Sequence, residues 1–109
     1  MEDINRIELE GTVGYVNVLD VGGKIVAYLS LQTNKALKSN DGTVMIDTTW
    51  HSVVVCRGKN TPDTASIRKG DRLHVTGRVR RQRYVTAYGE EIHSYEVVAS
   101  KAEIVKNKD

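Results

Sequence analysis

The sequence predicts an all-β protein in which five strands close into a small barrel, with one short helix between the third and fourth strands. Val, Thr, Ile and Tyr are abundant and favour pleated, half-buried strands. Apolar and polar residues alternate over several segments, which is the periodicity of a strand with one buried face. Clusters of Gly, Asn and Asp separate these segments and supply turns. A chain of 109 residues can bury one core, so we expect a single domain over residues 1–109.

The first half of the chain contains three expected strands, over residues 6–16, 24–33 and 44–57. Residues 34–43 are expected to form a polar loop, because they end in the turn signal Asn40-Asp41-Gly42. The centre of the third strand, Val53-Val54-Val55-Cys56, is apolar on both faces. Such a strand predicts a core on one side and a second partner, such as another subunit, on the other. Cys56 is therefore expected to be a buried small hydrophobic residue.

The second half contains the expected helix, over residues 61–70, followed by two strands over residues 72–85 and 92–105. Thr61 suits the cap of the helix, Pro62 its first position and Gly70 its end. Residues 87–91 are expected to form a hairpin loop. Three strands, a short helix and two further strands form the order of elements of an OB-fold.

Positive charge is concentrated in residues 68–83. This segment carries seven basic residues and one acidic residue, a net charge of +6, whereas the whole chain carries only +2. A basic stretch on a nearly neutral chain is typical of a protein that binds a polyanion. Charge alone leaves a second interpretation equally open, in which acidic residues such as Glu90 and Glu91 balance a solvated face.

The fourth strand places basic and aromatic side chains together. Its alternation puts Arg78, Arg80 and Tyr84 on one face, with Arg81 and Arg83 beside them near the strand end. Guanidinium groups contact phosphates and an aromatic ring stacks on a base, so this pattern favours binding of single-stranded nucleic acid. The alternative is a solvated edge strand whose arginines oppose aggregation.

The remaining aromatic residues leave several interpretations open. Trp50 is the only tryptophan, and a lone tryptophan is more often a core residue than a platform for a ligand, although the polar neighbours of Trp50 weaken that expectation. Tyr15 and Tyr28 have core-facing neighbours and are expected to be structural. Tyr88 lies in the hairpin loop, where a binding role and a plain exposed position are equally open.

Several function classes are not expected. The chain shows no local signature of a catalytic triad, a Cys/His pair or a glycine-rich phosphate loop, so we expect no enzyme activity and no cofactor. A single cysteine excludes an internal disulfide and a cysteine-based zinc site. No apolar run is long enough to cross a bilayer and no signal peptide is apparent, so the expected location is cytoplasmic.

Beyond these properties, a series of short motifs occurs in a fixed order. Thr49-Trp50-His51-Ser52-Val53-Val54 is similar to a Glu-Trp-His-x-Val-Val motif, and Val75-Thr76-Gly77-Arg78-Val79-Arg80 to Val-x-Gly-x-Leu-Arg. The other matching segments are Asn5–Gly14, Val26–Thr33, Arg68–Asp71 and Tyr95–Ala99. Through these motifs, nearly the whole chain resembles the bacterial single-stranded DNA-binding proteins. The motifs are weak one by one and specific as an ordered set.

The resemblance implies an OB-fold protein that assembles as a homotetramer, or as a dimer in some members, and binds single-stranded DNA independently of sequence in replication, recombination or repair. It implies stacking roles for Trp50 and Tyr84, and with the basic face it gives the expected DNA-binding set Trp50, Tyr84, Tyr88, Lys59, Lys69, Arg78, Arg80, Arg81 and Arg83. It implies that His51 lies at the subunit interface, to which we also assign Arg6 and Glu8.

This chain departs from the family pattern at two further stacking positions, where Leu37 and Cys56 stand in place of aromatic residues. Loss of two platforms predicts weaker binding unless Tyr88 or the arginines compensate. The family usually carries an acidic tail that recruits replication and repair enzymes, and this sequence ends without one. Two alternatives therefore stay open: an accessory module like the primosomal replication protein N, which acts mainly through replication proteins, and an RNA-binding OB-fold.

Overall fold

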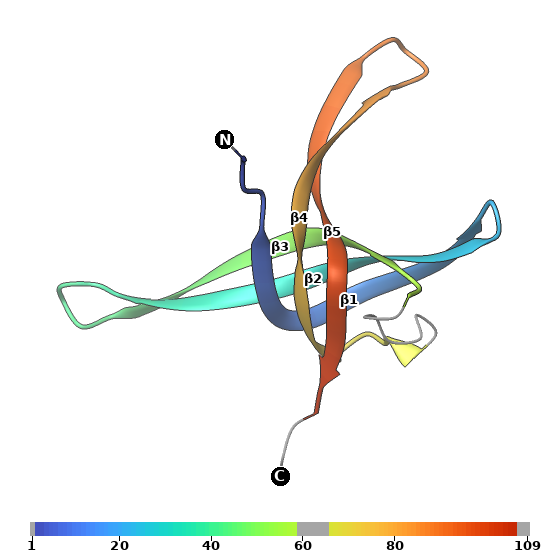
Figure 1. Cartoon of the computed structure of the whole chain (residues 1–109). Helices are drawn as coiled ribbons and strands as arrows, with labels where there is room; N and C mark the ends of the chain where they lie inside the picture. The colour runs from blue at the N-terminus through green and yellow to red at the C-terminus, as the bar shows by residue number, and fades with distance from the viewer. Residues whose placement is uncertain (1, 59–65, 107–109) are drawn as a thin grey trace.

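The computed structural model describes residues 2–58 and 66–106. Within these residues the chain forms five strands and no α-helix: β1 (Ile7–Val21), β2 (Lys24–Lys38), β3 (Val44–Cys56), β4 (Arg72–Val85) and β5 (Glu91–Val105). The strands close into one barrel in the order β1-β2-β3-β5-β4 (Figure 1). The predicted all-β class and five-stranded barrel are confirmed.

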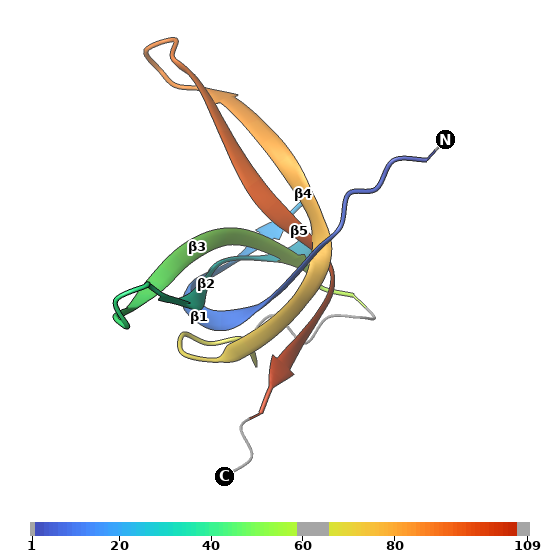
Figure 2. The ribbon, with the colours of Figure 1, turned by 90° about the vertical axis from the view of Figure 1, so that its left-hand side faces the viewer.

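The long first strand closes the barrel because it pairs with two neighbours. Residues 7–12 of β1 pair with β4, and residues 12–21 pair with β2. The pairing with β2 shifts between Val13 and Val16, where a bulge bends the strand (Figures 1 and 2). On the other side, β3 and β5 run parallel and pair only over Val53–Val55 and Val97–Ala99.

The core lies inside the barrel and consists mainly of aliphatic side chains from every strand. The largest fully buried side chains are Leu29, Leu31, Leu73, Val13, Val53, Val55 and Val75. Ile67, just before β4, packs against the same cluster. In β2, β3 and β4 these residues recur at every second position, as expected for strands with one face in the core.

The β2–β3 hairpin is longer than the sequence predicts. Residues 34–38, expected to belong to a polar loop, continue β2 and pair with residues 44–48 of β3. Both faces of this extension are exposed, so its residues need no alternating apolar pattern and resemble a loop in sequence. The β1–β2 and β4–β5 hairpins also project beyond the barrel (Figure 1).

Two further expectations about this region have different outcomes. Most of the expected helix, residues 61–65, lies outside the described residues, and the described remainder at residues 66–70 contains no α-helix. Cys56 is exposed, so its expected burial is wrong. Cys56 is the last residue of β3 and lies beyond Val53–Val55, the segment that pairs with β5. The apolar run in the sequence does not show where this pairing ends.

The tip of the β2–β3 hairpin is held by one carboxylate. Asp41 Oδ1 accepts hydrogen bonds from the Ser39 hydroxyl, from the Thr43 hydroxyl at 2.6 Å and from the Thr43 backbone N–H at 3.0 Å. These donors, the Ser39 hydroxyl foremost, favour the ionised form and lower the pKa of Asp41 to about 2.

We expect this turn to stay intact in mild acid. Because the pKa is lower in the folded chain, the stabilisation from Asp41 is fully present above its ordinary pKa of 3.8 and is lost as the pH falls through about 2. An NMR titration of the side-chain carboxyl carbons should place the Asp41 midpoint near that value. The variant Ser39→Ala should raise it. A wild-type midpoint at the ordinary value would contradict this account of the turn.

Candidate functional site

Trp50 lies on the outer face of β3, close to the barrel wall. Val53 and Val55 point into the core, so alternation turns Trp50 and Ser52 outward. The indole is 57% exposed. Trp50 is therefore not a core residue, and its ring is available to a ligand.

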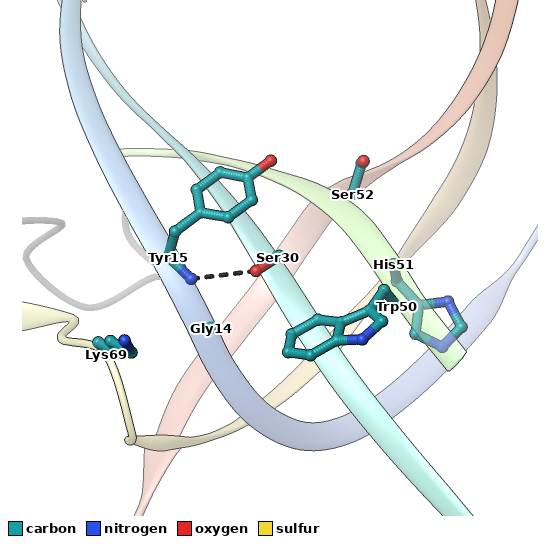
Figure 3. A pocket seen from close by; sticks show the side chains of 7 residues that line it. All are labelled: Gly14, Tyr15, Ser30, Trp50, His51, Ser52 and Lys69. Carbon is teal, nitrogen blue, oxygen red and sulfur yellow. Dashed lines mark hydrogen bonds between the residues drawn. The ribbon is translucent and has the colours of Figure 1, made fainter. Parts of the chain in front are cut away.

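A cavity of about 510 Å³ opens beside this indole (Figure 3). The Tyr15 and Trp50 rings flank it, with Gly14 and Ser30 between them. Its full lining is Gly14, Tyr15, Ser30, Trp50, His51, Ser52 and Lys69. Two aromatic rings, small hydroxyl side chains and one ammonium group suit a flat ligand that carries negative charge.

Gly14 allows the indole to lie directly against the β1 backbone. A Cβ atom at Gly14 would lie 2.6 Å from Trp50 Cζ3 and 2.5 Å from Ser30 Oγ, and both distances are too short for real contacts. The β1 bulge also allows the Tyr15 backbone N–H to donate a hydrogen bond of 3.0 Å to Ser30 Oγ. The bulge thus forms the floor of the cavity.

The bulge also explains why the expected structural role of Tyr15 is wrong. Continuous alternation would place Tyr15 on the same face as Val13, which is buried in the core. The register shift between Val13 and Val16 breaks that alternation, and the Tyr15 side chain is 57% exposed at the cavity. Tyr28, expected to be structural as well, is half-buried.

Lys69 reaches the cavity from a turn that is fixed to β1. The Asp71 carboxylate accepts a hydrogen bond of 2.9 Å from the Arg68 N–H, which closes the turn. The Gly70 N–H donates to the Val13 carbonyl and the Val13 N–H to the Asp71 carbonyl, both at 2.8 Å. The turn therefore delivers the ammonium group, a sequence-predicted DNA contact, to the cavity.

A second hollow of about 240 Å³ lies on the other side of Trp50. It forms where β3 and β5 separate before their short ladder, and it places Trp50 and Ser52 near Tyr95 of β5 and Val79 of β4. Tyr95 is 68% exposed. Tyr95 is not among the candidate site residues predicted from the sequence. The pairing of Tyr95 with Arg81 across the β4–β5 hairpin could have indicated it.

The arginines of β4 divide between the two faces of the hairpin. Arg81 and Arg83 share one face, and Arg78 and Arg80 lie on the other. Arg81 donates from Nε to His93 Nδ1 at 3.1 Å, and Arg83 Nε lies 2.7 Å from Glu91 Oε1. Glu91 balances the charge of Arg83, whereas Arg81 has no carboxylate within ion-pair distance among the described residues.

Arg80 has a structural partner that the sequence did not reveal. Its guanidinium donates to Glu96 Oε1, from Nε at 2.9 Å, and the Glu96 side chain is 7% exposed. An ion pair of this kind is expensive to break, because the buried carboxylate would lose its partner. Arg78 has no carboxylate within ion-pair distance among the described residues.

We therefore expect Arg80→Met to lower stability, by roughly 1–3 kcal/mol, because Glu96 would be left buried without a donor. Thermal unfolding followed by circular dichroism measures this. Arg78→Met on the same face is the matched control and should melt like the wild type. Equal melting temperatures for the two variants would show that the Arg80–Glu96 pair contributes little to the fold.

The other predicted site residues are dispersed. Tyr84 and Tyr88 lie on the β4–β5 hairpin, 52% and 94% exposed, away from both hollows. Lys59 lies outside the described residues. Of the predicted interface residues, His51 exchanges a 2.9 Å hydrogen bond with Thr33 Oγ1, Glu8 lies 3.1 Å from His74, and Arg6 lines a hollow beside Arg78.

Two kinds of feature are absent from the described residues. No helix there is long and apolar enough to span a membrane. No group of three or more His, Cys, Asp or Glu side chains in that part of the chain could hold a metal ion.

Comparison with known families and sequences gives one consistent result. The model of the single-strand binding protein family matches residues 4–105. Single-stranded DNA-binding proteins of Xylella fastidiosa and Xanthomonas axonopodis pv. citri are 27% and 29% identical to this chain over 106 residues, or 94% of it. The chain spans 63% and 58% of the lengths of these two relatives.

Solved structures share the fold. A Plasmodium falciparum SSB in complex with ssDNA superposes with a TM-score of 0.77 at 26% identity, covering 96% of both chains. A small single-stranded DNA-binding protein from Streptomyces coelicolor superposes with a TM-score of 0.69 at 18% identity, and that similarity concerns the fold alone. The barrel is therefore an OB-fold, as the order of elements predicts.

Proposed function

Because this chain belongs to the single-strand binding protein family, we propose that it binds single-stranded DNA independently of sequence and protects it during replication, recombination or repair. Its relatives are named as single-stranded DNA-binding proteins, and the superposed Plasmodium structure is a complex with ssDNA. Such a protein holds DNA and catalyses no reaction. We also propose that it acts in the cytoplasm.

One observation supports the proposal most directly, namely the exposed indole of Trp50 between two hollows. Every base has flat aromatic faces, so bases stack on an aromatic ring whatever the sequence of the strand. Lys69 stands at the first hollow, and Arg81 lies opposite Tyr95, which lines the second. These cations suit the phosphates of a strand whose bases lie on the outer face of the barrel.

The β4–β5 hairpin extends the proposed surface. Tyr84 and Tyr88 would offer further rings, and Arg78 and Arg83 further cations. Lys59, which lies outside the described residues, stays in the proposed set through the family resemblance. Arg80 is included with a reduced role, because Glu96 already engages its guanidinium. Of the four predicted site arginines of β4, Arg80 pairs with Glu96 and Arg83 with Glu91. Arg78 and Arg81 have no carboxylate within ion-pair distance in residues 2–58 and 66–106.

We also propose that the chain forms a homotetramer or a dimer, with His51, Arg6 and Glu8 at a subunit interface. Arg6 comes directly before β1 and Glu8 is the second residue of this strand, and both residues are exposed. Light scattering of the purified chain should give a mass that is a multiple of 12.1 kDa. A mass of one chain at all concentrations would contradict this part of the proposal.

The function is tested by fluorescence anisotropy with a labelled dT oligomer of about 16 nucleotides, and with competing RNA and duplex DNA. We expect saturable binding of the dT strand, and much weaker competition by duplex. Stronger binding of RNA of matched sequence would favour an RNA-binding OB-fold. No saturable binding at low salt would favour an accessory module whose main partner is another replication protein.

A further inference from the structure

We propose that Tyr15 and Tyr95 act with Trp50 as a track of three stacking rings, along which a single strand crosses the barrel from Lys69 to Arg81. This inference rests on the proposed function and specifies the path of the strand. Alternation in the sequence predicts a structural role for Tyr15 and no role for Tyr95. They would supply the platforms that Leu37 and Cys56 do not provide.

The first part of the track is the cavity between Tyr15 and Trp50. Both side chains are 57% exposed, and each forms one wall of the same cavity (Figure 3). The floor consists of Gly14 and Ser30, so nothing larger than a hydroxyl group rises between the rings. A cavity of about 510 Å³ lies within the range of sites for small ligands, which is ample for one nucleotide.

The second part is the hollow between Trp50 and Tyr95. Tyr95 is 68% exposed and lies on the face of the β4–β5 hairpin that also carries Arg81. Tyrosine exposes a large apolar surface, and clusters of exposed apolar surface mark interaction sites. Tyr95 does not belong to the hydrophobic core cluster of the described residues.

The two hollows border the same segment of β3, which is why we place one strand across both. Trp50, His51 and Ser52 line both of them. Positive charge stands at each end, since Lys69 lines the first hollow and Arg81 lies opposite Tyr95 next to the second. Neither cation has a carboxylate partner within ion-pair distance among residues 2–58 and 66–106. This arrangement suits a single strand of DNA whose phosphates contact the two cations and whose bases stack on the rings between them.

The test compares Tyr15→Leu and Tyr95→Leu with the wild type in binding a labelled dT oligomer at several salt concentrations. Leucine keeps an apolar side chain of similar bulk and removes the ring. Tyr28→Leu is the matched control, because Tyr28 is half-buried and lines neither hollow. A second measurement is photocrosslinking of an oligomer that carries 5-iodouracil, with mass spectrometry to locate the crosslinked residues.

We expect each track variant to bind about fivefold or more weakly, with an unchanged slope of log affinity against log salt because no charge is removed. Lys69→Met and Arg81→Met should each reduce that slope by about 0.7. Crosslinks should fall on Tyr15, Trp50 and Tyr95. Wild-type affinity in both tyrosine variants, or crosslinks confined to Tyr84 and Tyr88, would overturn the track while leaving the function intact. If the wild type itself does not bind, the proposed function fails instead.

Discussion

Replacing Gly77 with alanine is expected to destabilise the barrel by about 3 kcal/mol or more, a large part of the stability of a domain of this size. Gly77 follows the point where the β4–β5 pairing shifts register. A Cβ atom there would lie 2.1 Å from the Val98 carbonyl oxygen and 3.0 Å from the Ala99 Cα. Both atoms are backbone, so the clash is relieved only if the strands separate.

The melting temperature of Gly77→Ala should fall by about 12 °C or more. Gly23→Ala is the control, since Gly23 has a φ of +88° but a Cβ atom there meets nothing within 4 Å, so that only backbone strain is tested. Its strain should cost only about 1–2 kcal/mol. If the two variants lose the same stability, the close approach of β4 and β5 at Gly77 does not exist in solution.

Replacing Trp50 with alanine is expected to weaken binding of single-stranded DNA by about 1–3 kcal/mol, or roughly 5- to 150-fold in affinity. The indole is the ring that both hollows share, so its loss removes the centre of the proposed surface. Because more than half of the side chain is exposed, the fold should keep most of its stability. Anisotropy of a labelled dT oligomer measures the affinity.

Two companion variants make the Trp50 result interpretable. Trp50→Phe keeps an aromatic face and should retain most of the affinity. Gly14→Ala keeps the tryptophan but displaces its ring from the β1 backbone. The affinity of this variant for DNA should therefore lie between those of the wild type and Trp50→Ala. Unchanged affinity in Trp50→Ala, with the melting temperature also unchanged, would place the DNA on a different face.

The fold was predictable because the core follows a simple rule. Leu73 and Val75, like Val53 and Val55, recur with the period of a strand, and the predicted ends of β4 coincide with those in the structure. The rule fails where a strand leaves the barrel. Residues 34–38 are exposed on both faces, so only backbone hydrogen bonds define them as a strand, and those bonds leave no pattern in the side chains.

The site was less predictable, for a similar reason. Lys69 and the β4 arginines stand out through their charge, and Trp50 through the family resemblance. The exposure of Tyr15 depends on a bulge that shifts the register by local geometry, and alternation alone assigns the residue to the wrong face. The proximity of Tyr95 to Trp50 depends on where β3 and β5 cease to pair, which is a property of the closed barrel. The partner of Arg80 likewise required the β4–β5 register.

The most direct test of the proposed binding surface is titration of the wild-type chain with a dT oligomer, followed by the fluorescence of its single tryptophan. Stacking of a base on Trp50 predicts strong, saturable quenching. The affinity should fall as salt rises, with a slope of about −0.7 for each phosphate neutralised on a single strand. Binding seen by anisotropy without any change in Trp50 fluorescence would contradict the surface, and no saturable signal at low salt would contradict the function.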